Sequence, residues 1–318
     1  MFYSPLRYPG GKNKLSKFIS NICINNNIDG HYVEPYAGGA SVALHLLLEG
    51  KMSKITINDY DRSIWAFWRC VLSRHIQLCK MIEETEITIE NWKIQKRIQK
   101  NKEGADILEL GFSTFFLNRA NMSGIINAGA IGGIKQEGNY KINCRFNKKV
   151  LIERIRTIAK YKKQIHLHNL DALKLIQKIK KESSNQNTIF YFDPPYYSKG
   201  SSLYMNHYND DQHQEISKAI GNIKNIHWIV SYDNAVEIEK IYKWSKNKIK
   251  YSFNHSAYKA KEGKELLFFS DTLNKSFDKF NHLLPSIKTM KTNPTHFKQA
   301  QLNKTSTLDV ELETTLNR

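Results

Sequence analysis

The sequence predicts an α/β protein built on a mostly parallel sheet, and three features of the chain support this prediction. Short apolar runs alternate with amphipathic segments over residues 31–60 and again over residues 164–272. Several of these runs are almost continuously apolar, which is typical of parallel strands that helices cover on both faces. A glycine-rich stretch, residues 34–40, follows the first run and precedes a helix, as in Rossmann-like folds.

The first block of the chain predicts a strand, a loop, a helix and a second strand in that order. Residues 31–39, "HYVEPYAGG", are typical of a strand that runs into a glycine-rich turn, and residues 40–50 continue as an apolar helix. Gly50 ends this helix and is the residue type most often found at that position. Residues 54–59, "KITIND", form the next predicted strand.

The second block repeats the alternation. Four apolar runs predict strands at residues 164–172, 188–195, 226–234 and 264–271. Amphipathic segments between them predict helices at residues 171–181, 210–223 and 235–244. Strands that alternate with helices favour a sheet of parallel strands joined by helical connections.

Residues 61–163 interrupt this alternation. Their first part has helix-forming segments rich in Trp, Arg and Lys. A glycine-containing stretch at residues 129–149 follows and predicts an irregular hairpin. We therefore expect a catalytic domain made of residues 1–60 and 164–272, with residues 61–163 as an inserted domain. Beyond residue 272 the apolar periodicity fades, which predicts a flexible polar tail over residues 273–318.

The charge of the chain favours a polyanionic partner. It has 48 Lys and Arg against 30 Asp and Glu, a formal net charge of +18. An excess of this size is typical of proteins that bind nucleic acid, although it also occurs in proteins that are merely soluble and basic.

Cysteine spacing and hydropathy indicate a cytoplasmic protein. The four cysteines, Cys23, Cys70, Cys79 and Cys144, are widely spaced, so neither a disulfide framework nor a zinc site is expected. No metal site is predicted from the histidines, which lack a third ligand at a suitable spacing. No apolar run approaches the roughly 18 residues that a membrane span requires, and the N-terminus lacks a secretory signal.

The stretch from Glu34 to Ala40 is a candidate nucleotide-binding loop. A strand that ends in glycines and opens a helix presents backbone N–H groups where the chain can approach a ligand closely. Asp59 follows at the end of the next strand, where its carboxylate can accept hydrogen bonds from both hydroxyls of a ribose. Taken alone, the two glycines are also compatible with a simple tight turn.

A second glycine pair lies near the N-terminus. In the segment Tyr8-Pro9-Gly10-Gly11-Lys12, the backbone could wrap around a ligand while Tyr8 stacks on a ring and Lys12 donates hydrogen bonds. The segment lacks the spacing and the Ser or Thr of an ATP-binding P-loop. A structural turn followed by a solvated lysine explains it equally well.

The stretch Asp193-Pro194-Pro195-Tyr196 carries the most specific chemistry. An exocyclic amine of a base is a poor nucleophile because its lone pair is delocalised into the ring. If Asp193 accepts one N–H and the Pro194 carbonyl accepts the other, that lone pair becomes available for attack. Two prolines make a rigid corner without competing donors, and Tyr196 can stack on the base with roughly 1–3 kcal/mol.

Seven motifs in order resemble those of the Dam-type (D12 class) DNA adenine N6-methyltransferases. They are "RYPGGK" (7–12), "YVEPYAGGASVAL" (32–44), "IND" (57–59), "FFLNRANMSG" (115–124), "LDA" (170–172), "FDPPYY" (192–197) and "KELLFFS" (264–270). The resemblance spans residues 4–272. It implies a seven-stranded Rossmann-like methyltransferase sheet, S-adenosyl-L-methionine as methyl donor, double-stranded DNA as substrate, and a mainly helical target-recognition domain at the insertion.

The resemblance also implies roles for individual residues. The catalytic residues would be Asp193, Pro194, Pro195 and Tyr196. The cofactor-binding residues would be Tyr8, Gly10, Gly11, Lys12, Glu34, Pro35, Gly38, Gly39, Asp59, Asp171 and Asp193. Asn118 and Arg119 would lie on the DNA side, with base contacts from a hairpin near residues 124–147. In that hairpin the family often has "G-x-x-R-x-N", whereas this chain has "GIINAGAIGG" without the arginine.

The expected activity is transfer of the methyl group to N6 of adenine after the base is flipped out of the helix. N4-cytosine or RNA adenine methylation would use the same Asp-Pro-Pro-Tyr chemistry, and an inactive DNA-binding relative would keep the same charge. The family leaves open a cognate restriction endonuclease as a partner. The oligomeric state is not predicted. In the cell we expect a cytoplasmic protein held at the nucleoid by DNA.

Overall fold

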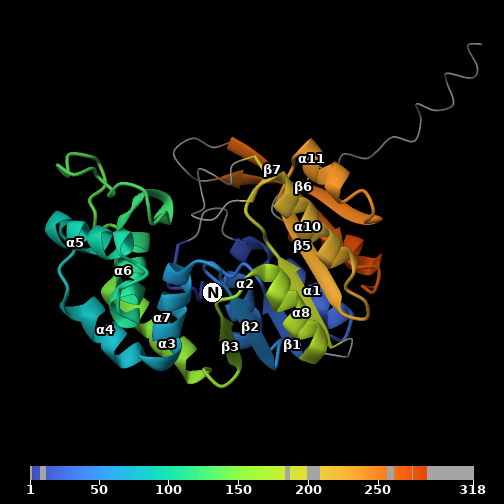
Figure 1. The fold of residues 1–318 in the computed structure, drawn as a ribbon, viewed down its shortest axis with the longest axis horizontal. Helices are drawn as coiled ribbons and strands as arrows, with labels where there is room; N and C mark the ends of the chain where they lie inside the picture. The colour runs from blue at the N-terminus through green and yellow to red at the C-terminus, as the bar shows by residue number, and fades with distance from the viewer. Residues whose placement is uncertain are drawn as a thin grey trace, which may run out of the picture. The chain divides into compact units, whose positions relative to one another are not determined.

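The centre of the fold is a seven-stranded sheet (Figure 1). The computed structural model describes residues 2–7, 12–182, 187–198, 208–255, 261–273 and 275–284. The strands, in the order β3-β2-β1-β4-β5-β7-β6, are β1 (His31–Glu34), β2 (Lys54–Asn58), β3 (Ile165–His168), β4 (Thr188–Phe192), β5 (His227–Asp233), β6 (Asn247–His255) and β7 (Lys261–Phe269). Strands β1 to β5 pair in parallel, and β7 runs antiparallel to both β5 and β6. The predicted mostly parallel α/β sheet is confirmed.

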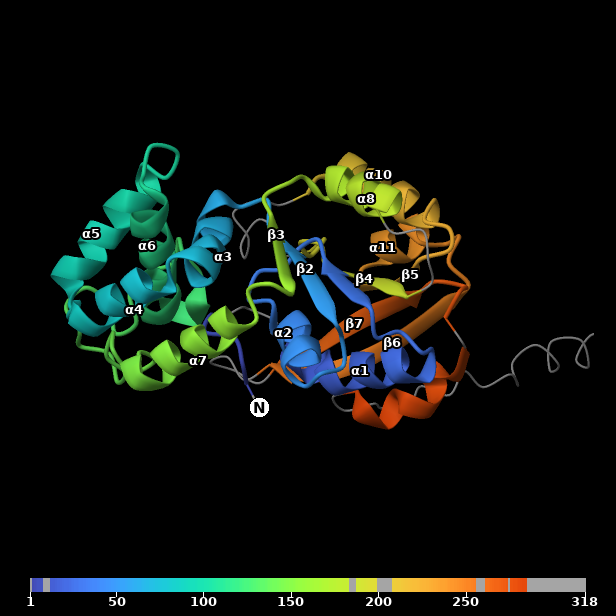
Figure 2. The same cartoon turned by 90° about the horizontal axis from the view of Figure 1, so that it is seen from below.

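Helices cover both faces of this sheet (Figure 2). One face carries α1 (Ser16–Asn25), α2 (Ser41–Leu48) and the 3-10 helices η1 (Lys12–Leu15) and η3 (Lys275–Leu283). The other face carries α8 (Ala172–Glu182), α10 (Asp210–Gly221) and α11 (Val236–Ile241). Burial on both sides explains why the strands are apolar at consecutive positions.

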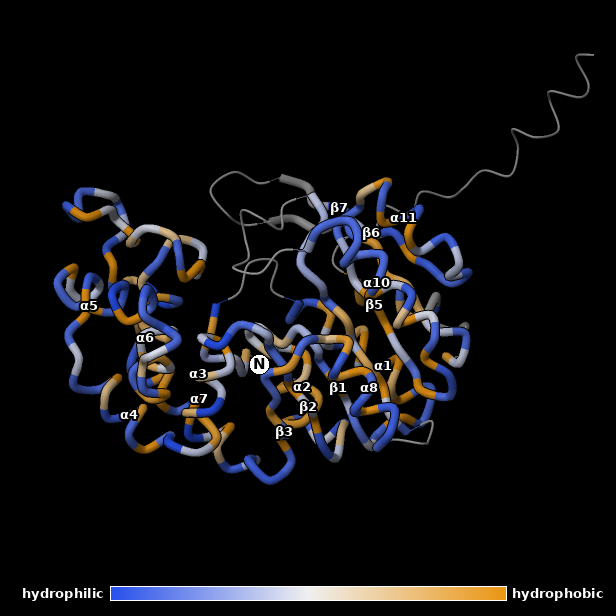
Figure 3. Tube along the Cα trace, viewed as in Figure 1, coloured by the Kyte–Doolittle hydropathy of each residue, from blue (hydrophilic) through white to orange (hydrophobic). Residues whose placement is uncertain are grey.

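Strand β4 illustrates how one strand serves two cores. Ile189 and Tyr191 belong to the core under α1 and α2, whereas Phe190 and Phe192 belong to the core under α8 and α10. The rings of Phe190 and Phe192 stack with centroids 5.2 Å apart. Each such side chain contributes roughly 1.5–3 kcal/mol when fully buried. In Figure 3, hydrophobic residues concentrate along the central strands, and hydrophilic residues lie mainly on the surrounding helices and loops.

Five α-helices lie between β2 and β3 in the chain. They are α3 (Arg62–Ser73), α4 (His75–Glu84), α5 (Ile89–Lys100), α6 (Ile107–Ala120) and α7 (Lys148–Lys160), with the short 3-10 helix η2 (Met122–Gly124) after α6. Helix α6 is buried at every position from Leu110 to Ala120, so the other helices pack around it. Asp61 and Asp106 cap α3 and α6 by accepting backbone N–H bonds.

The apolar core continues from the sheet into these helices, and Met1–Ile287 form one compact unit. The assignment of residues 61–163 to a separate domain therefore stays a prediction. A second unit, Lys288–Arg318, lies outside the described residues.

Two expectations about local structure are wrong. Residues 129–147 form successive turns rather than a hairpin of paired strands; the one β-bridge there joins Asn121 and Ala130. Gly132 and Gly133 both adopt positive φ, and Gln136 accepts from the Ile142 N–H, so the segment folds back on itself.

The second wrong expectation is the start of the flexible tail, which was predicted to cover residues 273–318. Residues 275–283 form η3, and the side chains of Phe280, Leu283 and Leu284 pack against the core that α1 covers. These three apolar residues are spaced like one side of a helix, which explains why the segment is held on the domain. The rest of the predicted tail lies outside the described residues.

Candidate active site

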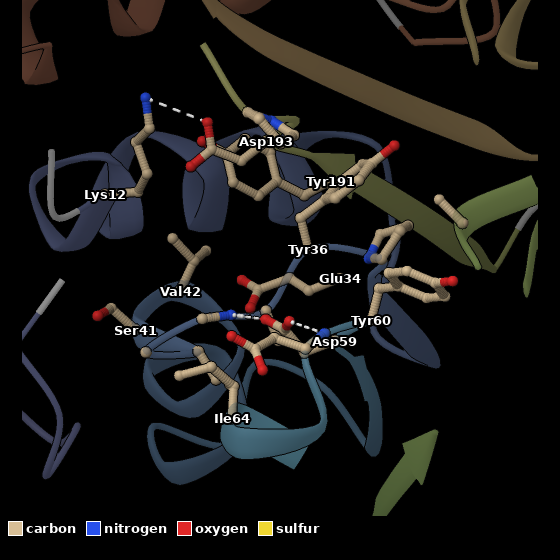
Figure 4. Close-up of a pocket in the computed structure, with 18 of the residues that line it drawn as sticks. Lys12, Glu34, Tyr36, Ser41, Val42, Asp59, Tyr60, Ile64, Tyr191 and Asp193 are labelled. Atoms are coloured by element: carbon tan, nitrogen blue, oxygen red, sulfur yellow. Dashed lines mark hydrogen bonds and ion pairs between the residues drawn. The ribbon is translucent and has the colours of Figure 1, made fainter. Parts of the chain in front are cut away.

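A cavity of about 400 Å³ opens where the parallel strands β1, β2 and β4 end (Figure 4). Its size lies within the range of small-molecule sites. It is lined by the loop after β1, the end of β2, the start of α8, the residues after β4, and Gly124 to Ile126 of the insertion. Carboxyl ends of parallel strands meet at one edge of a sheet, so this is where residues distant in sequence converge.

The loop after β1 is fixed from two sides. The Gly38 N–H donates to Oδ2 of Asp59 at 2.9 Å, and the Gly38 carbonyl accepts from Nε1 of Trp68 at 2.9 Å. Gly38 has φ +46°, a left-handed conformation that glycine adopts without strain. Ala40 is also left-handed, with φ +47°, so the entry to α2 is strained. The insertion, through Trp68 of α3, thus helps to shape the loop.

Glu34 ends β1 and points into the cavity (Figure 4). Its Oε1 accepts from the Tyr32 hydroxyl at 3.0 Å and from the Ala43 N–H at 3.1 Å. The residue is 4% exposed. Burial raises the pKa of this carboxyl to about 8, against the two hydrogen bonds, which lower it.

Asp59 follows β2 and also points into the cavity (Figure 4). Its two oxygens accept from the N–H groups of Gly38 and Asp61, each at 2.9 Å. Burial, with the neighbouring carboxylate of Asp61, raises the pKa of Asp59 to about 7. Within the described part of the chain, neither Asp59 nor Glu34 forms an ion pair.

The cavity is lined mainly by acidic ionisable residues, in contrast to the chain as a whole. Five acidic residues line it, Glu34, Asp59, Asp61, Asp171 and Asp193, and Lys12 is the one lysine or arginine among its described lining residues. The whole chain carries +18. Buried carboxylates without cationic partners favour a ligand that brings positive charge and hydrogen-bond donors, and they disfavour a polyphosphate.

Asp193 follows β4 and is held by two neighbours on the same oxygen. Its Oδ1 accepts from the Ser231 hydroxyl at 2.6 Å and lies 3.3 Å from Nζ of Lys12. Burial raises the pKa of Asp193, and the positive charge of Lys12 opposes that rise. The next turn is tied to β5, because the N–H groups of Tyr197 and Ser198 both donate to the Asp233 carboxylate at 2.9 Å.

Glu265 of β7 completes a buried network behind this corner. Its Oε1 lies 2.7 Å from Nζ of Lys12, and the hydroxyls of Tyr196 and Tyr251 both donate to its carboxylate. The Glu265 side chain is 2% exposed and that of Lys12 is 11% exposed. Burial alone would lower the pKa of Lys12, but Asp193 and Glu265 outweigh it and hold that pKa well above its ordinary value.

A family model for the D12 class N6 adenine-specific DNA methyltransferases matches residues 8–264. The chain belongs to this family. Its sequence is also 24% identical over 233 residues to the Type II methyltransferase M.MjaIII of Methanocaldococcus jannaschii, covering 67% of this chain and 77% of the relative.

Solved structures of methyltransferases are similar at a low level. A candidate RNA methyltransferase of Pyrococcus horikoshii, PH1948, matches at a TM-score of 0.38 and 12% identity over 83% of this chain and 86% of its own. The rRNA methyltransferase aviRa of Streptomyces viridochromogenes matches at a TM-score of 0.34 and 9% identity, over 85% of this chain and 89% of its own. A likeness of this degree supports no statement about activity.

Membership of the D12 class identifies the reaction. The protein is an S-adenosylmethionine-dependent enzyme that methylates N6 of adenine in DNA. Within the described residues, no helix is long and apolar enough to cross a membrane.

The residues of the cavity fit S-adenosylmethionine. When bound, this cofactor supplies an electrophilic methyl group on a positively charged sulfonium. That positive charge would favour the ionised forms of Asp59 and Glu34, whose pKa values burial raises and which lack a cationic partner among the described residues. We expect Asp59 to accept from the ribose hydroxyls and the loop from Glu34 to Gly39 to enclose the cofactor.

Most of the predicted cofactor residues come together in the cavity. Those that line it are Lys12, Glu34, Pro35, Gly38, Gly39, Asp59, Asp171 and Asp193, together with Pro195 of the catalytic set. Asp171 also caps the start of α8 by accepting the Leu173 N–H at 2.8 Å. Tyr8, Gly10 and Gly11 lie outside the described residues. Pro194 and Tyr196 are buried and do not line the cavity.

Three polar residues that hold the Asp193 corner were not predicted from the sequence. Ser231 and Asp233 are polar residues at the end of the apolar run that forms β5, and Glu265 is the acidic residue inside the motif "KELLFFS". In each case the available signal was a polar side chain within or directly after an otherwise apolar strand.

Asn118 and Arg119, the residues predicted on the DNA side, are buried at the end of α6. They are 1% and 8% exposed, and Nε of Arg119 donates to the Pro5 carbonyl at 2.7 Å. Asn118 bonds to the backbone of Arg7 and Gly124. Both side chains thus hold the backbone in place, and Asn118 also lines the cavity; their predicted role on the DNA side stays a prediction.

The raised pKa of Asp59 predicts a pH-dependent affinity for the cofactor. Below about pH 7 Asp59 is protonated in the free enzyme, and a neutral carboxyl is a weaker acceptor for hydroxyl donors. We expect the Kd for S-adenosylhomocysteine, measured by calorimetry, to rise severalfold between pH 8 and pH 6. Asp59→Asn should bind more weakly and show a smaller slope, the remainder coming from Glu34, whose pKa of about 8 lies in the same range; an equal slope in both proteins would contradict the assignment.

The same pKa values predict how pH affects the cofactor-free enzyme. Folding raises the pKa of Asp59 from 3.8 to about 7 and that of Glu34 from 4.5 to about 8. The folded chain therefore holds protons that the unfolded chain releases near pH 4. The contribution of both groups to stability is present below that pH and falls as pH rises toward 8.

Proposed function

We propose that this methyltransferase acts on a specific sequence in double-stranded DNA and flips the target adenine out of the helix into the cavity beside Asp193. Asp193 lines a cavity at the carboxyl edge of the sheet, where an amine still stacked within a duplex cannot reach it. Flipping costs a few kcal/mol, which contacts to the extruded base must offset.

One observation carries the proposed role of Asp193. Both Ser231 and Lys12 contact Oδ1, and among the described residues no hydrogen bond reaches Oδ2. The carboxylate is thus oriented through one oxygen while the other is available to a substrate. Oδ2 would accept one N6–H bond of the adenine, and the Pro194 carbonyl would accept the second.

These two acceptors would activate the amine. With both N–H groups bonded, N6 can leave the plane of the ring and direct its lone pair toward the methyl group. The nitrogen carries an extra proton after the attack, and Oδ2 of Asp193 is suited to take it. Holding the adenine and the cofactor in one cavity would supply much of the rate through orientation.

Lys12 and Tyr196 would keep the corner in place. Lys12 bridges Asp193 and Glu265, so it limits the repulsion between two buried carboxylates. Tyr196 is 6% exposed, and Nζ of Lys12 lies 5.1 Å from the centroid of its ring. Stacking of Tyr196 on the base stays a prediction. The contacts of Tyr196 with Lys12 and Glu265 also favour a role in holding the corner at Asp193 in place.

The insertion and the charge of the chain would bind the DNA. We propose residues 61–163 as the recognition region, because the loop at Gly124 to Ile126 lines the cavity that receives the base. The similarity to a Type II methyltransferase supports a restriction–modification role with a cognate endonuclease. Such an enzyme would act in the cytoplasm, at the nucleoid. The N4-cytosine, RNA and inactive alternatives predict different products.

A methyl-transfer assay tests the proposal. The purified protein is incubated with S-adenosylmethionine labelled in its methyl group and with double-stranded DNA of mixed sequence, and the nucleosides are separated after digestion. We expect label in N6-methyladenine and at one short sequence when the modified positions are mapped. Label in N4-methylcytosine, label in RNA only, or no incorporation would each refute the proposal. A parallel preparation of Asp193→Ala excludes a contaminating host enzyme.

A further inference from the structure

The side-chain amide of Asn118, near the end of helix α6, binds the N-terminal segment of the chain. Oδ1 of Asn118 accepts from the Arg7 N–H at 2.7 Å, and its Nδ2 donates to the Arg7 carbonyl at 2.6 Å. The same Nδ2 donates to the Gly124 carbonyl at 2.8 Å. One side chain 111 positions away in sequence thus pairs with both backbone groups of Arg7, as a neighbouring β-strand would.

Gly124 is fitted to this contact. Its φ is +78°, and a Cβ atom there would lie 2.7 Å from the Arg7 carbonyl oxygen. A side chain at this position would separate the two backbones, so the close approach requires glycine. We call Asn118, Gly124 and the backbone of Arg7 the clasp.

Two arginines of the insertion hold the segment just before the clasp. Nε of Arg119 donates to the Pro5 carbonyl at 2.7 Å, and Nη1 of Arg154 donates to the Ser4 carbonyl at 3.1 Å. The guanidinium of Arg154 also lies 5.2 Å from the centroid of the Phe2 ring. The N-terminal segment is therefore attached to the insertion at consecutive residues.

The clasp joins two parts of the active site. On one side, Gly124 leads directly into Ile125 and Ile126, which line the cavity from the insertion. On the other side, Arg7 lies five positions before Lys12, which lines the same cavity and contacts Asp193. A displacement of the loop at Gly124 must move Arg7 or break the amide bonds, because one side chain is bonded to both.

We propose that Asn118 is a positioning residue that couples DNA binding at the insertion to cofactor binding in the cavity. The proposal rests on the proposed function, in which the insertion is the part of the enzyme that meets DNA. Asn118 also lines the cavity, but its amide is bonded to the backbone of Arg7 and Gly124, so we expect it to act by setting the position of the Gly124 loop relative to Arg7. Coupling of this kind is reciprocal, so either ligand changes the affinity for the other by the same factor.

The test is a binding cycle. The Kd of S-adenosylhomocysteine is measured by calorimetry with and without saturating unmethylated plasmid-derived duplex DNA, and the ratio of the two values is the coupling. In the unmodified enzyme we expect a ratio of at least about fivefold, the lower end of typical coupling. In Asn118→Ala this ratio should fall toward one. The fold-reduction in the ratio should be larger than the fold-change that the substitution causes in the Kd of S-adenosylhomocysteine without DNA.

Ser113→Ala is a matched control on the same helix. Ser113 is fully buried and donates to the Gln95 carbonyl at 2.8 Å, so its loss also removes a buried hydrogen bond, but it contacts neither Arg7 nor Gly124. A merely structural role for Asn118 would weaken each ligand separately and leave the ratio as in Ser113→Ala, which would overturn the proposal.

A second variant, Arg154→Met, tests the coupling if Asn118→Ala does not fold. Arg154 is half-buried, and Arg154→Met keeps its apolar stem while it frees the Ser4 carbonyl. We expect an intermediate ratio, and an unchanged ratio in this variant would count against the coupling. Failure of the unmodified enzyme to bind DNA would refute the proposed function, whereas DNA binding with a ratio of one would refute the coupling alone.

Discussion

Asp193→Asn is expected to lower kcat by about 10³-fold, within the range attributed to a positioned acid–base group, while cofactor and DNA affinities change only a few-fold. Asparagine has the size of aspartate, so the corner and its packing should survive. An amide nitrogen facing the substrate would donate where N6 needs an acceptor. If the amide turned instead, its nitrogen would face Ser231 and Lys12 in place of Oδ1.

The measurement is a single turnover with enzyme in excess over labelled cofactor and DNA, which separates methyl transfer from product release. Asp211→Asn is a suitable control because Asp211 is exposed in the first turn of α10. The control should react at the rate of the unmodified enzyme. A transfer rate of Asp193→Asn within threefold of that rate would remove Asp193 from the mechanism.

Most of the sheet could be predicted because its central strands are apolar on both faces. Strand β6 could not, since "NKIKYSFNH" alternates Ile249 and Tyr251 with Lys248 and Lys250 and so lacks a continuous apolar run. Among the described strands it pairs with β7 alone and lies at one end of the sheet order, an edge position where lysines are common. Its existence was implied by the family resemblance alone.

The acidic half of the site was predictable for a topological reason. Glu34, Asp59 and Asp193 each follow an apolar run, and parallel strands place all such positions at one edge. The position of Glu265 in the site could not be predicted in this way, because β7 is antiparallel to β5. A residue in the middle of β7 reaches the corner only through its pairing with Asp233, which no local pattern indicates.

The contacts of the insertion were not predictable either. Asn118 and Arg119 were assigned to the DNA side by motif, but their partners are backbone groups at Arg7 and Pro5, more than one hundred residues earlier. A motif records which side chains occur together, and it does not distinguish a residue that contacts DNA from one that supports the chain that binds the cofactor.

Glu265→Gln is expected to lower both stability and turnover. Glu265 is the more deeply buried partner of Lys12 and the common acceptor of Tyr196 and Tyr251. Removing one partner of a buried ion pair typically costs about 3–5 kcal/mol; because Asp193 remains near Lys12, we expect about 3 kcal/mol in the free energy of unfolding. With Tyr196 and Lys12 less firmly held, kcat should fall by roughly 10–100-fold, comparable to the loss of an outer partner that orients a metal ligand.

A double-mutant cycle distinguishes this network from general damage to the core. Urea unfolding and single-turnover rates are measured for Glu265→Gln, Lys12→Met and the double variant. Because Lys12→Met removes the charge that Glu265 neutralises, the double variant should be less destabilised than the sum of the single changes. Strict additivity would mean that the two groups do not interact. Glu239→Gln is the control, since the contacts of Glu239 with Lys248 and Lys250 are partly exposed and screened by solvent, and its loss should leave the rate of methyl transfer unchanged.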